Sequence, residues 1–176
     1  MQKLKLEELN RISPEEYRAA EKMPVCILLD NVRSLHNVGA AFRTGDAFRV
    51  EKIYLAGITG QPPHREIQKT ALGATEVVPW EYFENANDIA GQLKKDGYSL
   101  VMVEQTTESM PLQKLDLDVK KKYCLVFGNE VTGIDEALLT QGTMALEVPQ
   151  AGTKHSLNIS VCLGIVLWEF YKRLHL

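Results

Sequence analysis

The stretch HSLNISVCLGIVLWEF, residues 155–170, predicts the last helix of the chain, and most of its residues are apolar. Its first turn carries Ser156 and Asn158, whose polar side chains need hydrogen-bond partners if the helix is buried. Ser156 is a suitable helix cap, but a cap leaves Asn158 unexplained. The alternative is a binding site built at the entrance of the helix.

The predicted last helix is apolar on more than one side. Its apolar residues fall on one stripe (Leu157, Val161, Ile165 and Trp168) and on others (Ile159, Leu163, Val166, Leu167 and Phe170). Such a helix needs more cover than one face of a sheet supplies. The pattern therefore favours a homodimer that packs through this helix.

Upstream of this helix, short apolar runs alternate with segments of helical spacing. Strands are predicted at 25–30, 52–57, 75–80, 98–105, 123–128 and 144–149, and helices at roughly 36–48, 64–72, 84–96 and 134–140. Strands that are apolar on both faces indicate a parallel sheet covered by helices on both faces. In such α/β folds, ligands bind beyond the carboxyl ends of the strands.

The chain of 176 residues is long enough for one ordinary domain. Residues 1–22 are predicted to form a separate helical arm before a domain that spans residues 23–176. Within the arm, Ser13 suits the N-cap of a helix, Pro14 its first turn, and Glu16 the third position of a capping box.

Composition excludes several classes of protein. The first residues lack the apolar core of a signal peptide, and Glu169, Lys172 and Arg173 interrupt the last helix before it is long enough to span a bilayer. A cytoplasmic protein is expected. The three cysteines (Cys26, Cys124 and Cys162) form no CxxC motif, so buried reduced thiols are favoured over a zinc or redox site.

The charge of the chain is uneven. A net charge of −3 argues against indiscriminate binding of nucleic acid. Residues 31–69, however, contain six Lys and Arg residues against three Asp and Glu residues. This basic segment is either a solvated face or a surface that binds phosphates.

Polar loops follow four of the predicted strands: DNVRSLHNVGAAFRTGDAF (30–48), EQTTES (104–109), GNEVTG (128–133) and PQAGTKHSLN (149–158). The first loop is not GxGxxG, so the common dinucleotide-binding motif is missing. Gly128 and Gly133 suit a loop that bends sharply or lets a ligand meet the backbone. Glu130 is either an anchor for a basic partner or a turn residue.

Two residues of the first loop have competing interpretations. Asn37 either caps a helix or serves a site, and Arg43 either pairs with Asp46 one turn later or serves a site. They are six positions apart and do not share a strict helix face, although both reach one loop if Asn37 precedes the helix. Small residues at 39–41 permit the close approach of another backbone. This stretch alone favours the cap and the ion pair.

Three stretches, taken together, favour a functional site over the cap and the ion pair: NVRSLHNVGAAFRTGDAF, LVFGNEVTGID and VPQAGTKHSLNISVCLGI. In order, spacing and position after strands they resemble the motifs of the SpoU family, the TrmH-like RNA ribose 2′-O-methyltransferases of the SPOUT superfamily. The resemblance covers about residues 23 to 174, and the Ser-Leu-Asn of the third motif is its most specific part.

The resemblance implies a sheet whose C-terminal segment passes through a loop to form a deep trefoil knot. It also implies that this knot binds S-adenosyl-L-methionine without a metal. By motif position, the cofactor contacts fall on Thr106, Gly128, Val148, Ser156 and Leu157. Gln150 stands where the family often has an apolar residue, which alters one wall of the adenine pocket.

The resemblance further implies transfer of a methyl group to a ribose 2′-hydroxyl of tRNA or rRNA by a homodimer. It makes Arg43 the catalytic residue, and Asn37, Glu130, Ser156 and Asn158 the groups that arrange it and the substrate. Because a guanidinium hardly ever loses its proton in proteins, we expect Arg43 to bind a phosphate rather than to act as a base. The alternative function is a catalytically inactive RNA-binding module of the same fold.

Overall fold

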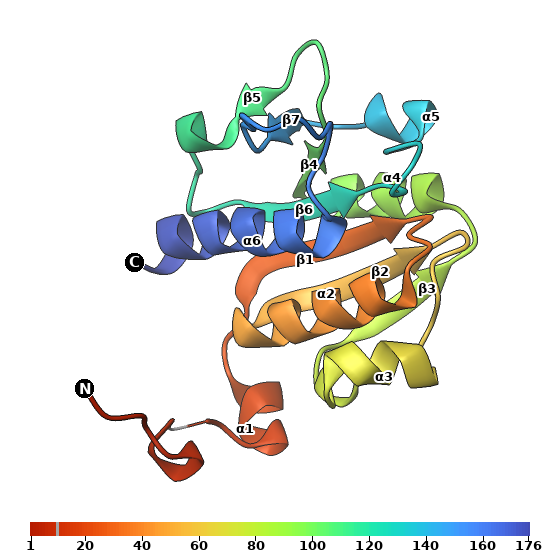
Figure 1. Cartoon of the computed structure of the whole chain (residues 1–176). Coiled ribbons are helices and arrows are strands. Elements are labelled where there is room, and N and C mark those ends of the chain that lie inside the picture. Colours follow the sequence, from red (N-terminus) through yellow and green to blue (C-terminus); the bar gives the residue numbers. More distant parts are fainter. Residues whose placement is uncertain (10) are drawn as a thin grey trace.

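The computed structural model describes residues 1–9 and 11–176, and its centre is a parallel β-sheet (Figure 1). The strands are β1 (Met23–Asp30), β2 (Val50–Ala56), β3 (Trp80–Phe83), β4 (Tyr98–Val103), β5 (Met110–Pro111), β6 (Lys122–Phe127) and β7 (Met144–Glu147). They form one seven-stranded sheet in the order β3-β2-β1-β6-β4-β7-β5, and every pairing is parallel.

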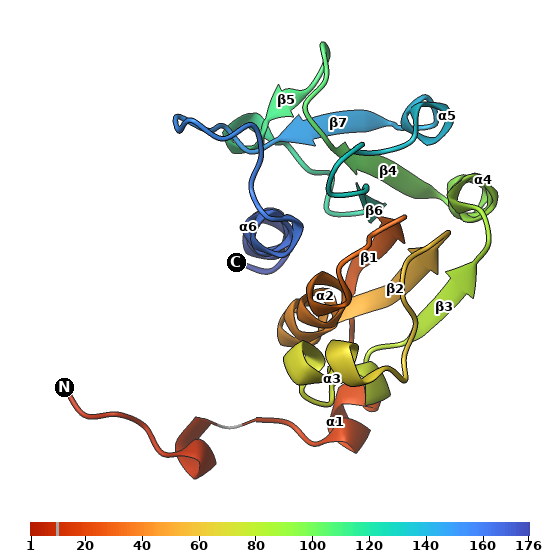
Figure 2. The same ribbon diagram turned by 45° about the vertical axis from the view of Figure 1, so that its right-hand side comes forward.

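Helices cover both faces of the sheet. They are α1 (Pro14–Ala19), α2 (Leu35–Ala47), α3 (Arg65–Ala71), α4 (Ala86–Lys95), α5 (Glu136–Leu139) and α6 (Ile159–His175), with short 3₁₀ helices at Leu6–Leu9, Ala74–Glu76 and Leu112–Lys114. Figures 1 and 2 show α2, α3 and α6 on one face and α4 and α5 on the other. The α/β class with a helix-covered parallel sheet is thus confirmed.

The alternation of side chains along β1 builds a core on each face. Ile27 and Leu29 belong to the core under α2 and α6, whereas Cys26 and Leu28 belong to the core under α4 and α5. All four side chains are essentially inaccessible to solvent. β1 is therefore a central strand that is buried on both faces. Polar groups at its carboxyl end lie next to the loop that follows it.

Three features differ from the sequence-based prediction. Of the strand predicted at 75–80, only Trp80 belongs to a strand: Gly73 adopts a left-handed turn (φ 91°), a 3₁₀ helix follows at Ala74–Glu76, and β3 begins only at Trp80. The two-residue strand β5 was not predicted. The last helix begins at Ile159 rather than at residue 155, because Asn158 is its N-cap.

The N-terminal segment contains the predicted capping box. The Ser13 hydroxyl accepts the Glu16 N–H, and the Glu16 carboxylate accepts the Ser13 N–H. Tyr17 of α1 is only 3% exposed and joins the core under α2, so α1 packs on the domain that follows it. The boundary of the arm at residue 22 stays a prediction. Within the part of the chain described here, no helix is both long and apolar enough to cross a bilayer.

Candidate functional site

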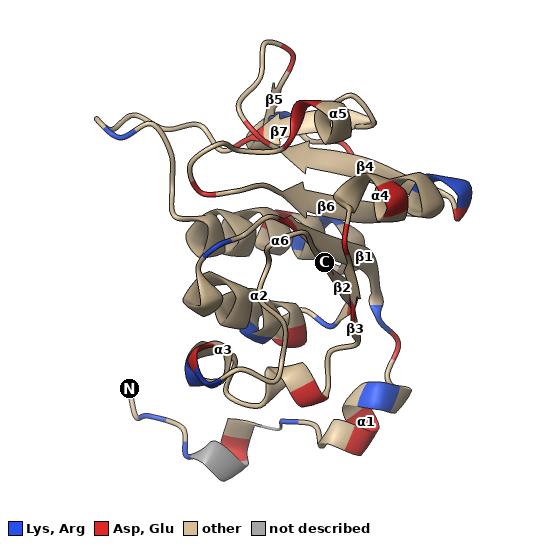
Figure 3. Cartoon of the chain, turned by 90° about the vertical axis from the view of Figure 1, so that its right-hand side faces the viewer, with Lys and Arg blue, Asp and Glu red and all other residues tan. Residues whose placement is uncertain are grey.

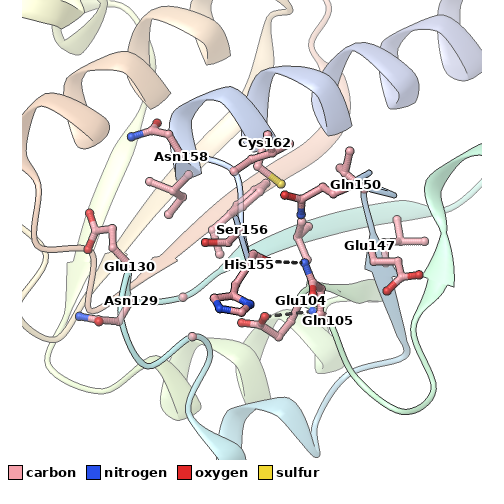
Figure 4. A pocket seen from close by; sticks show the side chains of 18 of the residues that line it. Glu104, Gln105, Asn129, Glu130, Glu147, Gln150, His155, Ser156, Asn158 and Cys162 are labelled. Carbon is pink, nitrogen blue, oxygen red and sulfur yellow. Dashed lines mark hydrogen bonds between the residues drawn. The ribbon is translucent and has the colours of Figure 1, made fainter. Parts of the chain in front are cut away.

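A cavity of about 470 Å³ lies at the carboxyl ends of β4, β6 and β7. Three loops enclose it: residues 104–109 after β4, residues 128–135 after β6, and residues 148–158 between β7 and α6 (Figure 4). Its walls are apolar where the strands end, at Val103, Phe127 and Leu146, and polar where the loops begin. A volume and a lining of this kind are typical of small-ligand sites.

The loop after β4 holds the other two loops together. Gln105 Nε2 donates to the carbonyl oxygen of His155 over 3.0 Å, as the dashed line in Figure 4 marks. Glu104 accepts the Ile134 N–H at 3.2 Å and the Gln105 N–H at 3.0 Å. Residues 104 and 105 therefore position both walls of the cavity.

The loop after β6 is a tight turn that depends on glycine. Asn129 and Gly133 exchange two backbone hydrogen bonds, of 3.0 and 2.9 Å, and Gly133 has a positive φ of 72°. A Cβ atom at Gly128 would collide with the backbone of Gly133 and Ile134. The chain's own backbone thus requires glycine at position 128. This agrees with the sharp bend predicted for the loop, and contact of its backbone with a ligand stays a prediction.

Glu130 of the same loop holds the N-terminus of α2. Its carboxylate accepts the backbone N–H groups of Arg33 and Ser34, at 2.9 and 3.0 Å, and Nδ2 of Asn37 at 2.9 Å. Partial burial acts to raise the pKa of Glu130, but these hydrogen bonds hold that pKa below its ordinary value. Glu130 is therefore ionised at neutral pH and is a poor general base.

Asn37 extends this network to α6. Its Oδ1 accepts Nδ2 of Asn158 at 3.2 Å, while Oδ1 of Asn158 accepts the Ser160 N–H at 2.9 Å and caps α6. Asn37 lies inside α2, whose N-cap is Ser34. Both alternative caps were thus wrong, because Ser34 rather than Asn37 caps α2 and Asn158 rather than Ser156 caps α6.

The two helices lie side by side in both views, with their N-termini together (Figures 1 and 2). Asn37 meets Asn158 at this end, and Phe48 packs on Trp168 at the other, with ring centroids 6.1 Å apart. The chain Glu130–Asn37–Asn158 thus joins two helix N-termini, where the helix dipoles favour an anion.

Arg43 lies apart from this network on the exposed side of α2. It does not line the cavity. Among the residues that the structure describes, it forms no ion pair, so the pairing with Asp46 was wrong. Gly39, one turn before Arg43, lies against Ile67 and Thr70 of α3, which confirms the predicted close approach of a second backbone.

The structure brings most of the predicted site residues together. The cavity is lined by Gly128, Glu130, Val148, Ser156, Leu157 and Asn158, and Asn37 contacts two of these. Gln150 also lines it. Thr106 sits in the turn closed by Ser109 and is not part of the lining. The functional roles of all these residues remain predictions.

Other lining residues were missed by the sequence reasoning: Glu104, Gln105, Asn129, Glu147, His155 and Cys162. The available signal was position, because Glu104 and Glu147 stand at the ends of strands and His155 adjoins the Ser-Leu-Asn motif. Figure 4 shows the Glu104 and His155 side chains next to each other at the cavity.

The cysteines are free. Cys26 and Cys124 are buried and lie opposite each other in β1 and β6, as expected for reduced core thiols. Cys162 is only partly buried, lines the cavity, and has a pKa raised to about 11 by burial and the nearby Glu104 carboxylate. Within residues 1–9 and 11–176, no group of three or more His, Cys, Asp or Glu side chains is arranged to hold a metal ion.

The fold and the cavity define an α/β protein with a ligand site at the carboxyl edge of a parallel sheet. The model of the SpoU rRNA Methylase family matches residues 24–168. The chain therefore belongs to the SpoU rRNA Methylase family.

Curated relatives carry RNA-modifying names. The chain is 27% identical over 147 residues to a tRNA (guanosine(18)-2′-O)-methyltransferase of Borreliella burgdorferi, covering 84% of this chain and 66% of that protein. It is 29% identical over 154 residues to the 23S rRNA (guanosine-2′-O-)-methyltransferase RlmB of Pseudomonas aeruginosa, covering 88% and 61%. The chain thus spans less than two thirds of either relative.

Solved structures share the fold. A TrmH/SpoU tRNA modifying enzyme from A. aeolicus superposes with a TM-score of 0.80 at 26% identity, covering 91% of this chain and 81% of that one. An AdoMet-bound rRNA methyltransferase from Sinorhizobium meliloti superposes with a TM-score of 0.81 at 28% identity, covering 93% and 62%.

Proposed function

We propose that this chain transfers a methyl group from S-adenosyl-L-methionine to a ribose 2′-hydroxyl of tRNA or rRNA. The observation that carries the proposal is the network Glu130–Asn37–Asn158 at the edge of the cavity, where it joins the N-termini of α2 and α6. The names of the two curated relatives favour a guanosine as the methylated nucleotide.

The cavity suits this cofactor. Its apolar floor of Val103, Phe127 and Leu146 fits an adenine ring, and the loop backbone at Gly128 and Leu157 supplies amide and carbonyl groups. The carboxylates of Glu104 and Glu147 suit the positive charges of the ligand. When bound, the cofactor supplies an electrophilic methyl group.

The chain's own residues then position the ribose. Glu130 is occupied by three donors and stays ionised, so it holds Asn37 in place rather than taking the proton. Ser156 and Asn158 line the cavity and contribute polar groups that can orient the ribose. Arg43 binds a phosphate with its planar fork of donors, and as the methyl group is transferred the proton of the hydroxyl passes to that phosphate or to water.

The exposed position of Arg43 is accounted for by a homodimer packed through α6. Three exposed apolar residues follow each other along this helix: Val161 is 51% exposed, Ile165 39% and Trp168 46%. A partner subunit seated there would cover them and would lie beside α2, which carries Arg43.

We also propose a trefoil knot in the C-terminal segment. The path of residues 148–158 supports it: this segment contributes to the cavity together with the loops after β4 and β6, and it then leads into α6, which packs beside α2. We also infer a cytoplasmic location, on the ground that the relatives are named for tRNA and rRNA.

The test is methyl transfer with labelled S-adenosyl-L-methionine to tRNA and rRNA from a strain that lacks the gene, followed by mapping of 2′-O-methyl positions by alkaline cleavage. Calorimetry with and without a chelator measures metal-free cofactor binding on the same protein. If RNA binds without any transfer, the inactive RNA-binding module is the correct alternative. If the cofactor does not bind, the proposal fails.

A further inference from the structure

The lining of the main cavity is acidic. Three carboxylates belong to it, at Glu104, Glu130 and Glu147, and among its described residues there is no lysine or arginine. Within the part of the chain that the structure describes, none of the three carboxylates forms an ion pair. Figure 3 shows further acidic segments in the loop after β4 and beside α5. The cavity therefore presents a negative potential to a ligand.

Two of the three carboxylates have partners at the edges of the cavity. Glu130 accepts three donors at the N-terminus of α2. Glu147 accepts the Ser109 hydroxyl at 3.0 Å, next to β5. In the view of Figure 4, Glu104 lies between them, with the His155 side chain beside it. Glu104 is thus the carboxylate best placed to act on a ligand inside the cavity.

The Glu104 carboxylate is held in position by neutral groups. Its Oε1 accepts the Gln105 N–H at 3.0 Å, and its Oε2 accepts the Ile134 N–H at 3.2 Å. Oε2 also lies so close to Gly133 that a Cβ atom at that position would collide with it. These contacts fix the carboxylate but bring no positive charge to it, and each oxygen keeps a second lone pair for another donor.

The charge of Glu104 acts on another wall of the cavity, formed by the start of α6. Cys162 lines the cavity there, and its pKa is raised to about 11 by burial and, to a smaller extent, by the Glu104 carboxylate. Such an effect requires a short distance and incomplete screening by solvent. A positive group bound between Glu104 and α6 would be stabilised by the same charge.

We infer that Glu104 selects the positively charged S-adenosyl-L-methionine over its product, S-adenosyl-L-homocysteine. The two molecules share the adenosine and the amino-acid group, and they differ by one methyl group and by the positive charge on sulfur. A carboxylate at this position stabilises the charged sulfonium and gives the neutral thioether no such gain. The inference rests on the proposed function, and its consequence is that fresh cofactor displaces the spent product readily.

The test measures three affinities by calorimetry on the full chain. The ligands are S-adenosyl-L-methionine, S-adenosyl-L-homocysteine and sinefungin, in which a carbon that bears an ammonium group replaces the sulfonium and restores the positive charge. We expect wild type to bind the two charged ligands more tightly than the neutral one by on the order of fivefold, the range of a partly exposed ion pair. Glu104→Gln should lose this preference and bind S-adenosyl-L-homocysteine as wild type does.

Two controls separate charge from structure. Glu108→Gln removes a charge from the same loop at an exposed residue outside the cavity lining, and it should retain the preference. On wild type, raising the salt concentration from about 0.1 to 1 M shortens the Debye length from about 10 to 3 Å. The preference should shrink with this change, a result that does not depend on how well Glu104→Gln folds.

The opposite results are equally clear. Equal affinity of wild type for the charged and neutral ligands would overturn the inference, and so would an equal loss of all three in Glu104→Gln, which would mean that Glu104 only holds the loops. A preference lost in Glu147→Gln but kept in Glu104→Gln would assign the selection to the wrong carboxylate. If no ligand binds wild type, the proposed function itself fails, whereas binding without preference contradicts this inference alone.

Discussion

Replacement of Glu130 by Gln removes the charge that holds the N-terminus of α2 while keeping the shape of the side chain. Glu130 accepts three donors at 2.9–3.0 Å. An amide offers one acceptor oxygen and turns a donor toward the others, so at least one of the three loses its acceptor. A hydrogen bond to a charged group is worth about 1.5–3 kcal/mol, and an anion at a helix N-terminus about 0.3–1 kcal/mol.

Glu130 is exposed, and solvent screening reduces both contributions. We therefore expect Glu130→Gln to lower the free energy of unfolding by about 2 kcal/mol, which corresponds to a fall of about 4–8 °C in melting temperature for a domain of this size. The rate of methyl transfer should fall by more than the loss of folded protein explains, because Asn37 loses its fixed orientation. Glu84→Gln, at an exposed residue after β3, is the matched control and should change neither.

The pH dependence has a defined sign. The pKa of Glu130 is lowered from its ordinary value of 4.5, so the stabilisation is fully present above pH 4.5 and is lost as the pH falls through the lowered pKa. Denaturant unfolding of wild type and Glu130→Gln across this range should show a difference that shrinks in acid. Equal stability of the two proteins at pH 7, or a difference independent of pH, would refute the argument.

Three further changes test the proposed site. Arg43→Lys should reduce single-turnover methyl transfer partially and Arg43→Ala much further, with cofactor affinity nearly unchanged, because lysine keeps the charge but lacks the fork; full activity of Arg43→Ala would remove Arg43 from the mechanism. Gly128→Ala should lower the melting temperature as well as cofactor binding, because its Cβ meets Gly133 and Ile134; a normal melting temperature by calorimetry would contradict this. Trp168→Glu should yield a folded monomer in sedimentation, since the side chain is 46% exposed in a single chain and a charge at a subunit interface is unfavourable; wild-type protein that is itself monomeric at micromolar concentration would exclude the dimer.

The sequence determined the class of the fold because hydrophobic periodicity is a local property. The alternation of apolar runs and helical segments is sufficient to predict a parallel sheet covered on both faces. The capping box at Ser13 was predictable for the same reason, since all of its partners lie within three residues. The strand at 75–80 failed where a left-handed turn at Gly73 overrode the apolar run.

Part of the cavity lining could also be identified from the sequence. The Ser-Leu-Asn motif and the glycine loop identified Gly128, Glu130, Ser156, Leu157 and Asn158, and all of them line the cavity. Glu104 and His155 escaped, because the bonds that bring their loops together join residues some thirty to fifty positions apart. No local pattern encodes such a contact.

Only the tertiary structure decided what the polar residues do for one another. Asn37, Glu130 and Asn158 are separated by 93 and 121 positions, yet they form one chain of hydrogen bonds. The sequence could therefore identify these residues, but it could not decide which of them cap a helix and which join the two helices through side-chain hydrogen bonds. The distinction depends on which donor meets which acceptor, and the packing of α2 beside α6 over the sheet fixes those partners.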